Sequence, residues 1–184
     1  MPQDLLEQLA EWVRCRHFGK YRGIVVDNDD ETGRGRLKVR VRSVLGSLEV
    51  WAMPCVPYAG AGVGFYSLPP KDAGVWVEFE GGDPSYPIWT GCFWADQELP
   101  DESNAALKIW KTDSLTIRID DDADEIVIEA TNGAKLTITT DVITEAGEAT
   151  LTVGSNGVVS EQGASKAEVT SAAFKVNNGA LEVV

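Results

Sequence analysis

Residues 107–184 repeat one pattern, in which short stretches with every second residue apolar are separated by turn residues. Alternation with period two is the pattern of a β-strand that has one apolar and one polar face. Glycine, asparagine and aspartate, which tolerate turn geometry, lie between the stretches. The apolar positions are Leu115, Ile117, Ile119, Ile126, Ile128, Leu136, Ile138, Leu151, Val153, Phe174, Val176, Leu181 and Val183.

Such strands carry too few bulky residues to build a two-layer core within one chain, because only Trp110 and Phe174 are aromatic here. Burying one Val, Leu or Ile is worth roughly 1.5–3 kcal/mol, so association that covers all of them would be strongly favourable. Three chains can turn these residues toward a common axis and pair their edge strands. The candidate trimer core is Leu115, Ile117, Ile119, Ile126, Ile128, Leu136, Ile138, Leu151, Val153, Phe174 and Val176.

The pattern alone leaves two alternatives open, a monomeric β-sandwich and a single-chain solenoid. Period two also predicts that Ile117 and Arg118 point to opposite faces, with Ile117 inside and Arg118 in solvent.

The first half of the chain predicts a small closed barrel. Alternation in residues 36–42 places Leu37, Val39 and Val41 on one face and basic residues on the other. Five or six strands in about 75 residues is the size of an OB-fold barrel. The expected strands are Tyr21–Asp27, Arg36–Arg42, Glu49–Pro54, Gly64–Leu68, Gly74–Glu80 and Ile88–Phe93.

The remaining segments complete a division into four parts. Leu5, Leu9 and Trp12 repeat at helical spacing, so residues 1–18 are expected to hold a short helix that needs a surface to dock on. Residues 19–95 form the barrel, residues 96–106 a polar linker, and residues 107–184 the trimeric stalk. The N-terminal acids do not fit a signal peptide, and no apolar stretch is long enough to span a membrane.

Charge separates the two halves of the chain. Residues 1–95 carry 10 Lys or Arg and 12 Asp or Glu, whereas residues 96–184 carry 6 and 17. The acidic half should repel nucleic acid and anionic lipid. Cys15, Cys55 and Cys92 match no zinc or redox spacing, so we expect buried or partly buried reduced thiols.

The barrel sequence resembles the baseplate assembly protein V family, the central spikes of contractile phage tails, which are related to type VI secretion spikes. The segments that carry the resemblance are residues 51–65, Leu68-Pro69, residues 74–84, residues 87–91, Tyr21–Val25 and Gly35–Val41. It covers about residues 19–94, and the stalk resembles the family only in style.

The resemblance implies an all-β chain with an N-terminal OB-fold barrel preceded by a short helix, then a C-terminal intertwined triple-stranded β-helix. It implies a homotrimer in the tail baseplate of a virion, assembled in the host cytoplasm. It would cap the tail tube through a hub protein, pierce the host envelope on sheath contraction, and carry a small PAAR-like tip protein. No nucleic acid partner is expected, and the alternative function is a trimeric receptor-binding fibre.

No enzymatic site is expected. The linker is too short for the lysozyme domain of some relatives, and the His-x-His metal pattern of others is missing because His17 is the only histidine. Residues 120–125 lack the spacing of a calcium loop, and residues 60–64 lack the Lys of a phosphate loop, so a solvated turn and a tight barrel loop are favoured. The expected catalytic, cofactor-binding and metal-ligating residues are therefore none.

Overall fold

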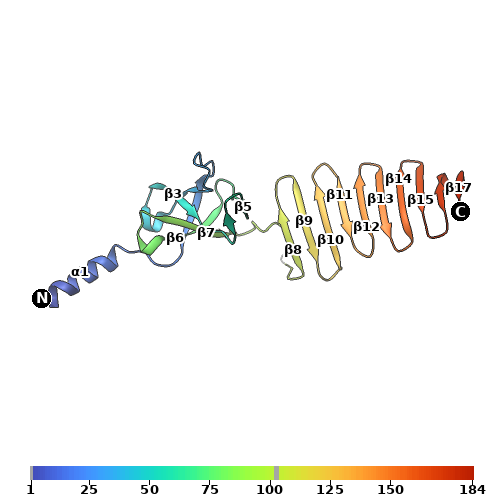
Figure 1. The fold of residues 1–184 in the computed structure, drawn as a ribbon. Coiled ribbons are helices and arrows are strands. Elements are labelled where there is room, and N and C mark those ends of the chain that lie inside the picture. The colour runs from blue at the N-terminus through green and yellow to red at the C-terminus, as the bar shows by residue number, and fades with distance from the viewer. Residues whose placement is uncertain (1, 102–103) are drawn as a thin grey trace. The chain divides into compact units, whose positions relative to one another are not determined.

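The computed structural model describes residues 2–101 and 104–184 and divides into two compact units, Met1–Glu98 and Leu99–Val184. Figure 1 shows a helix and a barrel in the first unit and one sheet in the second. Residue 1 of the expected helix segment and residues 102–103 of the expected linker lie outside the described residues.

Helix α1 (Pro2–Arg14) begins the chain, and the segment after it is tied to the barrel. Arg16 forms an ion pair with Asp83 at 3.0 Å, and the backbone N–H of His17 donates to the carbonyl of Gly82 at 2.8 Å. The Trp12 ring lies 6.3 Å from that of Phe18. The large apolar side chains of α1, such as Leu5 and Leu9, are exposed, so the docking surface that the sequence predicts for this helix stays a prediction.

Five strands close the barrel in the order β1-β2-β3-β7-β6. The parallel pair is β3 with β7, and the other neighbours are antiparallel. This closed five-stranded arrangement is OB-like, so the predicted helix and barrel are confirmed. The strands are β1 (Tyr21–Asp27), β2 (Leu37–Arg40), β3 (Glu49–Pro54), β6 (Gly74–Phe79) and β7 (Pro87–Phe93).

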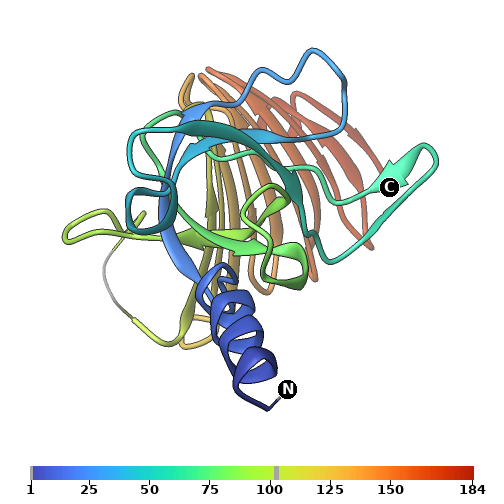
Figure 2. The ribbon, with the colours of Figure 1, turned by 90° about the vertical axis from the view of Figure 1, so that its left-hand side faces the viewer.

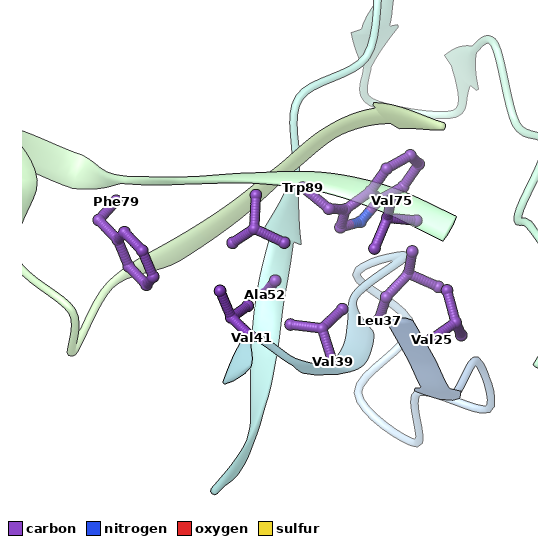
Figure 3. Close-up of a cluster of buried hydrophobic side chains, with 9 residues drawn as sticks. Val25, Leu37, Val39, Val41, Ala52, Val75, Phe79 and Trp89 are labelled. Carbon is purple, nitrogen blue, oxygen red and sulfur yellow. The ribbon is translucent and has the colours of Figure 1, made fainter. Parts of the chain in front are cut away.

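The barrel core comes from the inward face of each strand (Figure 3). Leu37, Val39 and Val41 are fully buried, as their alternation predicts. Trp89 closes one part of the core, and its indole N–H donates to the carbonyl of Gly35 at 3.2 Å. The whole cluster is Val25, Leu37, Val39, Val41, Ala52, Val75, Val77, Phe79 and Trp89.

The connections differ from the sequence prediction in one important place. The expected strand Gly64–Leu68 is wrong, because only Gly64 is in a strand and the chain then runs irregularly to β6. The short strands β4 (Ala59–Gly60) and β5 (Val63–Gly64) instead form a separate hairpin, which projects from the barrel wall in Figure 2. Two short helical segments, α2 (Arg42–Leu45) and η1 (Glu80–Gly82), complete the unit.

The second unit is one ten-stranded antiparallel sheet in which each strand pairs with its neighbours in sequence. Short turns connect the strands, and several contain glycine at positive φ, such as Gly133 and Gly147. A one-turn segment, η2 (Asn177–Gly179), precedes the last strand. The strands are β8 (Leu107–Lys111), β9 (Leu115–Asp120), β10 (Glu125–Ala130), β11 (Lys135–Ile138), β12 (Val142–Ala146), β13 (Ala149–Gly154), β14 (Gly157–Gln162), β15 (Ser165–Val169), β16 (Phe174–Val176) and β17 (Leu181–Val183).

This meander restricts how three chains can combine. Interior strands of the sheet use both backbone edges within the chain, so only β8 and β17 are edge strands. Winding of three chains about one another, predicted from the sequence, is not tested by a single chain and stays a prediction.

Candidate assembly surfaces

One face of the ten-stranded sheet, here called the apolar face, carries two continuous columns of mainly apolar side chains. Residues directly opposite one another on antiparallel strands lie on the same face. Following the register from β8 to β17 gives the first column as Lys108, Ile119, Ile126, Ile138, Val142, Val153, Val158, Val169, Phe174 and Val183. The second column is Trp110, Ile117, Ile128, Leu136, Thr144, Leu151, Ser160, Ala167, Val176 and Leu181.

All eleven residues predicted as trimer core lie on this face. Ten belong to the two columns, and Leu115 lies beside them, opposite Ala130. The large hydrophobic strand residues that are exposed in this sheet are also all on the apolar face. Leu151, near the middle, keeps 41% of its surface exposed. The sheet thus gathers the predicted residues on one side and leaves them partly open to solvent.

Sequence reasoning missed several members of the same face. Trp110, Val142, Val158 and Val169 belong to the columns but were not predicted as core. Alternation is hard to recognise around them, because small and polar residues such as Ser160 share their strands. The glycines in the turns between the strands are the sequence feature that could have marked where these strands begin and end.

The opposite face, here called the polar face, carries cross-strand pairs of opposite charge. Lys175 bonds Glu182 at 3.1 Å and lies opposite Glu168 on its other side. Lys166 lies 3.4 Å from Glu161, its direct partner. Opposite charges across a ladder favour one pairing register.

The middle of the polar face is less open than the sequence predicts. Arg118 lies on the face opposite Ile117, as alternation requires, but it is half-buried rather than in solvent. Its guanidinium donates to Asp120 at 3.2 Å, while its Nε is buried without a hydrogen-bond partner among the described residues. Thr137, in the same row, is buried.

On the barrel, the basic side chains of residues 34–42, which include the predicted basic face of residues 36–42, are largely neutralised by acids from neighbouring elements. Arg36 binds Asp30 at 2.7 Å, and Arg40 and Lys38 pair with Glu49. The Arg36 guanidinium holds the pKa of Asp30 well below its usual range, and Asp30 in turn raises the pKa of Arg36. These ion pairs leave Arg34 and Arg42 as the exposed cations of this segment.

Asp30 also organises the β1–β2 turn, which is why its environment matters for the fold. Its side chain is 3% exposed and accepts hydrogen bonds from the backbone N–H groups of Thr32, Arg34 and Arg36. A carboxylate that accepts several N–H donors is strongly held in its charged form. The Asp30 carboxylate therefore fixes the conformation of the β1–β2 turn.

Other candidate residues occupy structural positions. His17 forms a triangle of rings with Tyr21 and Phe79, whose centroids each lie 6.0 Å from its own and 5.7 Å from each other. The acidic run 120–125 forms the β9–β10 turn, where Asp120 accepts from the N–H groups of Asp122 and Ala123. Among residues 2–101 and 104–184, no three His, Cys, Asp or Glu side chains converge as a metal site. No helix in that part of the chain is long and apolar enough to cross a membrane.

The three cysteines are free, as predicted, but the predicted burial is wrong for Cys15 and Cys55, which are exposed. Cys92 is also exposed as a residue, although burial raises the pKa of its thiol. Cys15 follows α1, Cys55 follows β3, and Cys92 is the penultimate residue of β7. Cys15 and Cys55 thus lie just beyond the end of an element, whereas Cys92 lies near the end of β7, opposite the core residue Val75.

Comparison with known proteins identifies the barrel. Residues 21–94 match the family described as the type VI secretion system/phage-baseplate injector OB domain. The match spans all five barrel strands, from the start of β1 to just beyond β7. The resemblance to baseplate spikes seen in the sequence is thereby confirmed through this domain. A search of curated proteins found no matching relative.

Proposed function

We propose that the chain is the homotrimeric central spike of a contractile injection machine, in which residues 107–184 form the stalk. The observation that carries this proposal is an injector OB domain followed in the same chain by a sheet with one continuous apolar face. The domain family fits a role in a phage baseplate or a type VI secretion spike. The sheet supplies the means of association.

The apolar face supports the trimer on physical grounds. Large exposed apolar patches mark association surfaces. Three copies can each place two apolar columns toward a common axis, so that every sheet becomes one wall of a three-sided prism. A closed threefold arrangement covers all three faces equally and leaves the polar faces outside. Residues 96–184 carry the acidic excess of the chain, which keeps such an exterior soluble.

The same arrangement suits a part that transmits force along its axis. Bending a prism of three sheets requires breaking ladder hydrogen bonds in one wall and separating the packed columns at the same time. In the proposed role the spike caps the tail tube through a hub protein and is driven through the host envelope when the sheath contracts. Arg42, an exposed cation just after β2, is a candidate for the hub contact.

The distal edge of the stalk supports a tip partner. Strand β17 is an edge strand, and Leu181 and Val183 on it are exposed. Edge strands with apolar side chains are normally covered, because they otherwise template association. A small PAAR-like protein seated on three such strands would cover them and supply the point. This cap is part of the proposal, as is the absence of enzymatic activity.

Electron cryo-microscopy of the particle that carries this chain tests the role. The proposal places three copies on the tail axis, between the end of the tube and a separate tip chain, before contraction. Density that places the chain at the baseplate periphery, as a receptor-binding fibre, would contradict it. Density in which the chain itself forms the sharp point would overturn the tip partner alone.

A further inference from the structure

The barrel carries one segment without charge that projects away from its core. No charged residue occurs between Glu49 and Lys71. Within this stretch, residues 55–68, here called the arm, follow β3 and contain the β4–β5 hairpin. Figure 2 shows the hairpin, in turquoise, standing off the barrel wall.

The arm is a built structure rather than a slack connection. Ala59 pairs with Gly64 and Gly60 with Val63, and the N–H of Phe65 donates to the carbonyl of Tyr58 at 2.9 Å. A Cβ at Gly64 would lie 3.0 Å from the Tyr58 carbonyl oxygen, so the close approach of the two strands favours glycine there. These backbone hydrogen bonds stabilise the hairpin conformation.

Its side chains are open to solvent although they are apolar or aromatic. Tyr66 is 78% exposed and Tyr58 59%. Between the arm and the barrel wall lies a hollow of about 450 Å³, lined on the barrel side by Gly33, Arg34, Gly35, Pro54 and Trp89 and otherwise by the arm itself. Exposed tyrosine beside a mainly apolar hollow with one cation in its wall is the composition of a protein–protein interface.

We infer that in the trimer the arm of each barrel packs onto the hollow of the neighbouring copy, with Tyr66 as its anchor. This inference rests on the proposed trimer and extends it from the stalk to the barrels. A trimeric stalk tethers three barrels in one assembly, which raises their mutual effective concentration to roughly millimolar. The first partner that an exposed arm meets is therefore another copy of the same chain.

Charge and symmetry also support a second copy of the chain as the partner of the arm. Residues 1–95 hold 10 basic and 12 acidic side chains, so the barrels do not repel one another as the acidic stalks do. The arm offers no charge through which a basic or acidic partner could be recognised. An arm that reaches a different surface on the next copy makes a head-to-tail contact, and such contacts close into a ring of three when the rotation between copies is the one that a threefold stalk imposes.

Site-specific photo-crosslinking in the full chain tests the inference without the hub or other tail proteins. Benzoylphenylalanine replaces Tyr66 in one sample and Tyr86 in the control. Tyr86 is 61% exposed, precedes β7 and lies outside the arm. Light scattering first establishes the mass of each sample. We expect irradiation at position 66 to give covalent dimers and trimers, joined to peptides around Leu68 and Trp89, with little product at position 86.

The outcomes separate the inference from the function on which it rests. A trimeric mass without crosslinks between copies at position 66, or with equal yields at both positions, would overturn the arm contact and leave the trimer intact. A monomeric mass would contradict the proposed trimer itself.

Discussion

Placing a lysine at Leu151 should take the stalk apart, whereas the same substitution at Thr150 should not. The two residues are neighbours on β13 but belong to opposite faces of the sheet. Leu151 lies in the second apolar column, between Thr144 and Ser160. Thr150 lies on the polar face between Glu145 and Glu161, where an added cation gains partners.

The expected cost follows from exposure. Because 41% of Leu151 is exposed in the single chain, and full burial of a leucine is worth about 1.5–3 kcal/mol, association gains about 0.6–1.2 kcal/mol there per chain. Three copies lose about 2–4 kcal/mol, which weakens association by about 30- to 700-fold. Three ammonium groups left in a water-poor interior add several kcal/mol each.

Light scattering at several concentrations and thermal unfolding measure both effects. We expect Leu151→Lys to dissociate at micromolar concentration and to melt well below the parent chain. Thr150→Lys should stay trimeric, since opposite-charge pairs across a ladder contribute about 0.2–1 kcal/mol each. If the chain were monomeric, a lysine at a half-exposed position would reach water, and the two variants would behave alike. Equal behaviour would therefore refute the assignment of the apolar face.

Three further predictions concern the barrel, the sheet turns and catalysis. Asp30→Asn should lower the melting temperature at neutral pH more than Asp29→Asn does. Because the folded pKa of Asp30 is depressed, its contribution is complete above the ordinary value of 3.8, so the gap between the parent and Asp30→Asn should shrink as pH falls below it. Gly157→Ala should destabilise the stalk by about 1–3 kcal/mol in denaturant titrations, because its φ is +132° and a Cβ would meet the Val169 carbonyl; an unchanged midpoint would contradict the hairpin geometry. The purified chain should not clear peptidoglycan, and clearing that a point substitution abolishes would show an active site.

Alternation of apolar and polar residues correctly predicted the faces of strands wherever it was uninterrupted. The burial of Leu37, Val39 and Val41 and the shared face of Ile117 and Ile128 follow directly from period two. These elements could be predicted because local pattern and tertiary environment agree in them. The barrel order could not be read from pattern alone, since the parallel β3–β7 pair depends on long-range contacts.

The sequence reasoning failed where local signals were ambiguous or tertiary context decided. Residues 64–68 are rich in apolar and aromatic side chains, yet Gly64 closes a hairpin and Tyr66 is exposed, so hydrophobicity there does not mean a barrel strand. Arg118 is charged but half-buried, because the row to which it belongs on the polar face is crowded by Ile109 and Val127. A substitution at Arg118 is therefore a poor control for the solvent-facing side of the sheet, and Thr150 is the better position for that control.

The mass of the purified chain in solution tests the central claim most directly. Light scattering coupled to size-exclusion chromatography reads this mass without reference to shape. The account predicts three times the chain mass of 19.9 kDa, constant over the micromolar range. A mass of 19.9 kDa at every concentration would contradict it, since the apolar face would then be exposed in the native state.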